Sequence, residues 1–218
     1  MRPKLIIGNK NYSSWSLRAW LLLKEADIDF EEIRLSLDSP DFAEKIAKYS
    51  HAMRVPVLIL DDQPVWDTLA IAETVAERWP EKALWPEDPV ARAFARSICA
   101  EMHAGFVTLR DTMPMNCRAM GRRIELPDEL TVEIDRIFAI WHECHDRFGS
   151  DEGWLFGDFS IADAMFAPVI LRFRTYGINL PQAANDYHDR LLQSEALESW
   201  LLAAESETEV LEEDEAGL

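Results

Sequence analysis

The chain has 218 residues, of which 48% are hydrophobic and 28% are charged, and its formal net charge is -18. This length allows one large or two small hydrophobic cores, and the strong negative charge excludes nucleic acid and anionic membrane surfaces as expected partners. No apolar run is long enough for a transmembrane helix, and the N-terminal stretch lacks the apolar centre of a signal peptide. The three cysteines are far apart and match no metal-ligand spacing, so we expect a cytoplasmic protein without a metal site.

Residues 1–79 alternate between strand and helix patterns. The predicted elements, in chain order, are a strand at residues 4–8, a helix at 14–26, a strand at 30–35, a helix at 41–49, a strand at 55–60, a brief returning strand at 65–66 and a helix at 69–79. The alternating first half predicts a crossover between parallel strands, and the closing hairpin predicts an antiparallel edge. We therefore expect a small α/β domain at residues 1–79.

A linker is predicted at residues 80–89, where three prolines interrupt any helix. Beyond it strand patterns nearly vanish. Helices are predicted at residues 90–113, 127–148, 160–176 and about 185–204, the last as one helix or two. An all-helical bundle at residues 90–204 is therefore the expected second domain.

The end of the chain, residues 205–218, differs in composition from both domains. Its acidic stretch ESETEVLEEDE holds seven acids and no base. Such a composition is typical of a disordered, solubilising tail, and we assign it no chemistry.

Serines open two of the predicted helices. Ser13, Ser14 and Ser16 crowd the first helix start, although one hydroxyl suffices for a cap worth about 1 kcal/mol. The others invite a second explanation, and at this point both a capping role and a chemical role stay open. Ser160 and Asp163, by contrast, have the spacing of a capping box, which predicts a purely structural role.

Two motifs lie at element boundaries of the first domain. Pro56 stands in a β-branched run, where proline cannot donate a ladder hydrogen bond. A cis Val55–Pro56 bond explains this position, and a trans proline that opens the strand is the alternative. Asp67 and Thr68 open the last helix of the domain, and either is a good N-cap.

On the predicted helix at residues 90–113, His103, Phe106 and Arg110 fall on one stripe. A flat ring with a cation beyond it suits an aromatic or carboxylate-bearing ligand, and core packing with an exposed arginine is the alternative. Arg18 is different, because its helix is apolar almost all round. We expect Arg18 to have a buried or intersubunit acidic partner.

Taken in order and spacing, these motifs resemble a known family. The stretches NYSSWSLRAWLLLK, VPVLILDD and WDTLAIAETVAE resemble the thioredoxin-like N-terminal domain of cytosolic glutathione transferases, and GDFSIADAMFAPVI resembles their helical C-terminal domain. The similarity spans nearly the whole chain except the acidic tail. SSWSLR looks most like the serine-type classes, including the zeta class, in which a cysteine stands at the position of Trp15. The resemblance implies glutathione as co-substrate, a small electrophile as second substrate, and a homodimer.

The resemblance assigns the serines a chemical role. Glutathione must react as its thiolate, and lowering a thiol pKa by about two units requires roughly 2.7 kcal/mol of anion stabilisation. A hydroxyl beside the positive helix N-terminus suits this task. By the family pattern Ser13 is the expected activating residue, Ser14 is a close second, and Ser16 supports them. Tyr12 is a rival that we rank below the serines.

The remaining roles follow from the same resemblance. The backbone of Val55, turned by Pro56, is expected to pair with the cysteinyl part of glutathione as a short antiparallel strand. Asp67 and Thr68 are expected to hold its γ-glutamyl end, although the family usually has Glu or Gln where Asp67 stands, one methylene longer.

The expected electrophile pocket comprises Tyr12, His103, Phe106 and Arg110. Glutathione transfer is the leading function. The first alternative is a glutathione-dependent cis-trans isomerase of the maleylacetoacetate type, against which Trp15 counts. The second is a non-catalytic binding or scaffold protein with the same fold.

Overall fold

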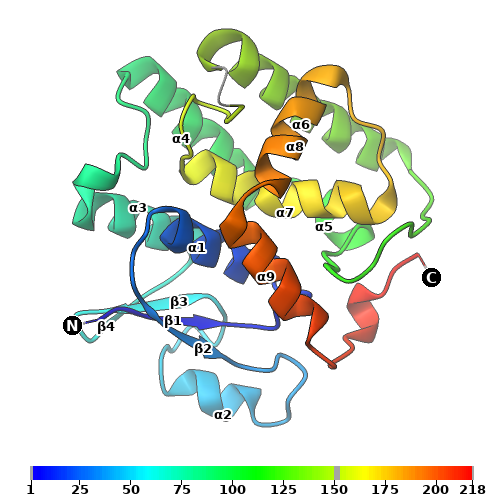
Figure 1. Ribbon diagram of the computed structural model, residues 1–218. Helices are drawn as coiled ribbons and strands as arrows, with labels where there is room; N and C mark the ends of the chain where they lie inside the picture. The colour runs from blue at the N-terminus through cyan, green and yellow to red at the C-terminus, as the bar shows by residue number, and fades with distance from the viewer. Residues whose placement is uncertain (1, 150–152, 218) are drawn as a thin grey trace.

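The computed structural model describes residues 2–149 and 153–217, and its first domain is a four-stranded sheet with three helices (Figure 1). The elements of this domain are β1 (Lys4–Ile7), α1 (Ser14–Glu25), β2 (Glu31–Arg34), α2 (Phe42–Ala47), β3 (Val57–Leu60), β4 (Gln63–Val65) and α3 (Thr68–Arg78). The predicted order of strands and helices is confirmed.

The sheet has the strand order β2-β1-β3-β4. β1 is parallel to β2 and antiparallel to β3, and β4 forms the antiparallel edge that the hairpin pattern predicts. Because side chains alternate along a strand, the two faces of the sheet bury different residues. Ile6 and Val57 pack with Ile46 of α2, whereas Leu5 and Leu58 belong to the large core shared with α1, α3 and the helical domain.

Among the residues that the structure describes, the regular secondary structure of the second domain is helical, apart from isolated bridges at residues 154–158. Its elements, with the linker turn and the C-terminal turn, are η1 (Pro80–Lys82), α4 (Pro89–Ala104), α5 (Val107–Thr112), α6 (Asp128–Phe148), α7 (Ile161–Tyr176), α8 (Gln182–Leu192), α9 (Glu195–Glu205) and η2 (Glu212–Asp214). α7 is buried along almost its whole length and packs against α1 and α4, so it joins the two domains. Within the described ranges, no helix combines the length and hydropathy that crossing a membrane requires.

The helix predicted at residues 90–113 is two helices. α4 ends at Gly105, whose N–H donates to the Glu101 carbonyl, and Phe106 then adopts a left-handed φ of 53° before α5 begins. This break changes the helix direction between His103 and Arg110. The prediction of one continuous stripe is therefore wrong, because it assumed an uninterrupted helical repeat.

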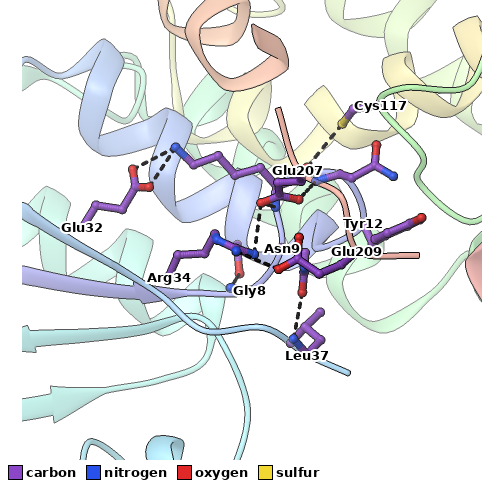
Figure 2. Close-up of polar contacts among 12 residues, drawn as sticks. Gly8, Asn9, Tyr12, Glu32, Arg34, Leu37, Cys117, Glu207 and Glu209 are labelled. Atoms are coloured by element: carbon purple, nitrogen blue, oxygen red, sulfur yellow. Dashed lines mark hydrogen bonds and ion pairs between the residues drawn. The ribbon is translucent and has the colours of Figure 1, made fainter. Parts of the chain in front are cut away.

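The prediction of a disordered acidic tail is also wrong for the part of it that the structure describes. We call residues 206–217 the C-terminal segment; it follows α9 and lies against the loop between β1 and α1 (Figures 1 and 2). Leu211 is buried, Glu209 pairs with Arg34 at 2.7 Å, and Glu215 pairs with Arg122. The acids are thus balanced by arginines from both domains, a pairing that local composition does not reveal.

Candidate functional site

A cavity of about 820 Å³ lies between the two domains. It is lined by Tyr12, Ser14, Trp15, Ala52, Arg54, Val55, Pro56, Trp66, Asp67, Thr68, His103, Arg110, Asp111, Pro114, Met115, Arg172 and Asp214. A second hollow of about 600 Å³, beside the linker, contains none of the predicted site residues. The interdomain cavity is therefore the candidate active site.

The structure separates the three serines of α1. Ser13 occupies the N-cap position without a side-chain capping bond, and its Oγ donates to Ser16 Oγ at 2.7 Å. Ser16 Oγ in turn accepts the Gly8 N–H at 3.0 Å. Ser14 instead lines the cavity, and its Oγ accepts a hydrogen bond from Arg172 Nη2 at 3.3 Å. Successive helical residues point about 100° apart, so a shift of one residue decides which hydroxyl faces the cavity.

Val55 and Pro56 line the cavity wall formed by the first domain. The Val55–Pro56 peptide bond is cis, as the sequence predicts. The Trp66–Asp67 bond is cis as well, which the sequence did not suggest. Both cis bonds border the cavity, one at each side of the β3–β4 hairpin.

Asp67 and Thr68 combine a capping role with a place at the cavity. Asp67 Oδ1 accepts the Leu69 N–H at 3.1 Å, which confirms the cap, and its Oδ2 lies 2.8 Å from His103 Nε2. Thr68 is buried, and its Oγ1 donates to the Trp15 carbonyl at 3.3 Å. The contact between Asp67 and His103 links the two domains across the mouth of the cavity.

The predicted electrophile residues are only partly brought together. His103 and Arg110 both line the cavity and approach the ring of Trp15. The imidazole centroid of His103 lies 5.4 Å from the Trp15 ring centroid, and the guanidinium carbon of Arg110 also lies 5.4 Å from it. Tyr12 also lines it, but its hydroxyl donates to Glu215 at 2.7 Å, and burial followed by this bond raises the pKa of Tyr12. Phe106 is 6% exposed in the core and does not line the cavity, because the chain turns at this residue.

Arg18 and Arg172 form a buried positive cluster behind Ser14. The partners of Arg18 in the described chain are the carbonyls of Met165 (2.8 Å) and Ser14 (3.1 Å) and the face of Trp15, so the expected buried acidic partner is replaced by backbone oxygens and a ring. Burial, then Arg172 and Arg110, lower the pKa of Arg18 well below its usual value. Burial, then Arg110, lower the pKa of Arg172 to about 10. With a pKa of about 10, Arg172 remains a cation at neutral pH, and it lines the cavity beside Ser14, where it can stabilise an anion.

The lining residues that the sequence reasoning missed include two charged ones, Arg172 beside Ser14 and Asp214 in the C-terminal segment. Arg172 is a cation inside α7, which is otherwise apolar and buried on nearly every side, and this contrast is a signal that the sequence does contain. Asp214 comes from the C-terminal segment, and burial, then the neighbouring Glu213, raise its pKa to about 6. No local pattern marks Asp214, because its place depends on where the end of the chain packs.

Comparisons with known proteins agree with this fold. Residues 12–78 match the model of the family described as "Glutathione S-transferase, N-terminal domain". Probable maleylacetoacetate isomerase from Caenorhabditis elegans is 26% identical, and maleylacetoacetate isomerase from Rattus norvegicus is 28% identical, each over 82% of both chains. A crystal structure of a glutathione transferase homologue from Burkholderia gl BGR1, with bound glutathione, superposes with a TM-score of 0.71 at 25% identity and covers 95% of this chain and 100% of that one.

The α/β domain followed by a helical bundle, with a cavity between them, is the architecture of a thioredoxin-like domain joined to an all-helical one. The match at residues 12–78, the relatives and this architecture together support the resemblance of the chain to the cytosolic glutathione transferases. The fold class expected from the sequence is confirmed.

Proposed function

We propose that this protein is a glutathione transferase in which Ser14, rather than Ser13, donates a hydrogen bond to the glutathione thiolate. The single observation that carries the proposal is the position of the Ser14 hydroxyl at the cavity, where it accepts from Arg172. Accepting that bond uses a lone pair of the hydroxyl, and its hydrogen remains available for a second acceptor. Ser13, by contrast, donates its hydrogen to Ser16.

The energetics of thiolate stabilisation are consistent with this arrangement. A thiol with a pKa of about 8.5 needs roughly 2.7 kcal/mol of preferential stabilisation for a two-unit drop. A hydrogen bond to a charged group contributes about 1.5–3 kcal/mol, and the N-terminus of a helix about 0.3–1 kcal/mol. Ser14 at the start of α1 therefore supplies about the required amount, and the positive charge of Arg172 adds to it.

Glutathione is proposed to bind along the wall formed by the first domain. Val55, next to the cis proline, lines the cavity, and its backbone suits pairing with a peptide-like cysteinyl unit. The carboxylate of Asp67 suits the ammonium of the γ-glutamyl end, and the start of α3 at Thr68 suits its carboxylate. On the opposite wall, His103 and Arg110 approach the ring of Trp15 of α1, and this part of the cavity is proposed to receive an electrophile that carries a flat or anionic group.

A glutathione-dependent cis-trans isomerase is the second candidate function. It is favoured by the relatives named maleylacetoacetate isomerase, which include a protein from Pseudomonas aeruginosa that is 25% identical over 81% of this chain. In an isomerase the thiolate adds to a double bond, permits rotation and leaves, so the same activated sulfur serves both reactions. Trp15, in place of the cysteine of the zeta class, distinguishes this chain from that pattern.

Calorimetry and kinetics test the proposal. Glutathione is expected to bind at millimolar concentration or below and to be consumed in stoichiometric amounts with a chloronitrobenzene-type electrophile. Catalytic cis-to-trans conversion of maleylacetoacetate without net consumption of glutathione would instead establish the isomerase. Absence of glutathione binding would contradict both the transferase and the isomerase and would leave the scaffold alternative. One relative, a stringent starvation protein A homologue from Coxiella burnetii, has a name that states no enzyme activity.

The assembly and location of the protein are part of the same proposal. The family resemblance supports a cytoplasmic homodimer. Size-exclusion chromatography with light scattering should give about twice the chain mass of 25.0 kDa. A mass near that of one chain would contradict the dimer.

A further inference from the structure

The loop that leads into α1 is held by a carboxylate from the other end of the chain. Glu207 Oε1 accepts the Lys10 N–H at 2.8 Å, and Glu207 Oε2 accepts the Asn11 N–H at 3.0 Å (Figure 2). The Glu207 side chain is only 7% exposed, so water competes little for these bonds. Buried backbone N–H groups need acceptors, and here one carboxylate serves two successive ones.

Arg118 fixes the same contact from the helical domain. Its guanidinium donates to the Glu209 carbonyl at 2.7 Å, to the Glu207 carbonyl, and to the Tyr12 hydroxyl at 2.9 Å. Its backbone N–H donates to Asn11 Oδ1 at 2.9 Å. The loop and the C-terminal segment are therefore joined both directly and through a shared cation.

A second acid of the C-terminal segment binds the loop at its far end. Glu215 Oε1 accepts from the Tyr12 hydroxyl at 2.7 Å and from Asn116 Nδ2 at 2.8 Å. Burial alone would raise the pKa of Glu215, but the hydrogen bonds from Tyr12 and Asn116 and the charge of Arg122 lower it. Glu215 is thus a second acid that binds the loop, at Tyr12, two residues before Ser14.

We infer that Glu207 is a positioning residue of the thiolate site. It acts through the loop at residues 9–13, whose geometry sets the start of α1 and hence the direction of the Ser14 hydroxyl. The acidic C-terminal segment is accordingly part of the active-site architecture and not a solubilising appendage. This inference deepens the proposed function and rests on it.

The test measures the thiolate absorbance of bound glutathione against pH in the wild-type protein and in Glu207→Ala, Glu207→Gln and Glu205→Gln. Glu205 is an exposed acid two residues away, with the same charge, and serves as the control. Glu207→Ala should raise the apparent pKa of the bound thiolate and lower kcat/KM by ten- to a hundredfold, the usual effect of misplacing a reacting group. Glu207→Gln keeps one acceptor and should fall between Glu207→Ala and the wild type, whereas Glu205→Gln should match the wild type.

The outcomes separate this inference from the proposed function. A wild-type protein that does not bind glutathione, or does not lower its thiol pKa, contradicts the proposed function itself. The inference is overturned by a different result. In that case the wild type binds glutathione and lowers its thiol pKa, and Glu207→Ala and Glu207→Gln reduce the melting temperature but leave the thiolate pKa unchanged. Glu207 would then have a merely structural role. Should Glu207→Ala not fold, the isosteric Glu207→Gln carries the test. Hydrogen exchange at residues 9–13 that is no faster in the variants than in the wild type would also contradict it.

Discussion

The helices α1 and α7 both begin at serines, and their starts differ in what the polar groups do. At the start of α7, Asp163 Oδ2 accepts from both the N–H and the Oγ of Ser160 at 2.8 Å, and its Oδ1 accepts the Leu155 N–H at 3.1 Å. At the start of α1, Ser13 makes no capping bond, and Ser14 faces a cavity. A serine whose hydrogen bonds are all made within the helix start, such as Ser160, stabilises the fold. A serine whose hydroxyl faces a cavity, such as Ser14, is available to a ligand.

The α7 start should therefore show the largest effect on stability. Asp163 is fully buried, and Asp163→Ala leaves two backbone N–H groups and a hydroxyl without acceptors. At about 1–3 kcal/mol for each unsatisfied buried group, partly relieved by relaxation, we expect a loss of about 4 kcal/mol in the free energy of unfolding. Urea denaturation measures this value. Asp158→Ala, which removes an exposed acid nearby, is the control and should be within about 0.5 kcal/mol of the wild type.

Arg172 links the two helices, because it belongs to α7 but donates a hydrogen bond to Ser14 at the start of α1. Arg172→Gln removes the charge beside Ser14, and we expect kcat/KM to fall by about ten- to a hundredfold, as for loss of a charged hydrogen bond. Steady-state kinetics with glutathione and an electrophile measure the effect. Arg174→Gln, two residues further along the same helix and outside the cavity lining, should leave kcat/KM unchanged. Equal losses in the two variants would mean that Arg172 contributes only to packing.

Asp67 tests an intermediate case, in which one side chain both caps a helix and faces the ligand. Asp67→Ala should weaken glutathione binding by about tenfold through loss of the partner for the ammonium group, and reduce stability by about 1 kcal/mol through loss of the cap. Calorimetry and thermal unfolding measure the two effects. Glu77→Ala, at an exposed position of the same helix, should change neither. If Asp67→Ala lowered the stability but did not weaken glutathione binding, Asp67 would act only as a helix cap.

The last stability prediction concerns Asp214, which lines the cavity from the C-terminal segment. Its pKa is about 6 in the folded protein and near 3.8 otherwise, so between these values the folded state holds a proton that the unfolded state has lost. The contribution of Asp214 to stability is thus complete below about pH 4 and is lost as the pH rises through 6. Asp214→Asn should gain stability relative to the wild type over this window, and a difference independent of pH would contradict the assignment.

Local patterns in the sequence were sufficient for the element order of the first domain and for the capping box of α7, and the cis bond before Pro56 was one of two alternatives that they offered. The pattern failed where the helix is interrupted, at Gly105 and Phe106, because the left-handed backbone of Phe106 turns the chain and Phe106 does not line the cavity. It also failed where partners are distant in sequence: Glu207 contacts a loop almost 200 positions earlier, and Arg172 approaches Ser14 from the second domain. Such contacts depend on tertiary packing, which no local periodicity encodes.

The choice between Ser13 and Ser14 combines both difficulties. The family pattern favours the first serine of the pair, but the direction of a side chain at a helix start changes by about 100° from one residue to the next. The structure directs Ser13 toward Ser16 and Ser14 toward the cavity. Only an assay that reports on the sulfur itself can distinguish the two.

The most direct test of that choice is the pH titration of the thiolate absorbance of bound glutathione in the wild type, Ser14→Ala and Ser13→Ala. The wild type should give an apparent pKa about two units below that of the free thiol, and Ser14→Ala should raise it by at least one unit. Ser13→Ala should change it little, since its hydroxyl is bonded to Ser16. A rise in the apparent pKa that occurs only in Ser13→Ala would contradict this assignment and would identify Ser13 as the residue that stabilises the thiolate.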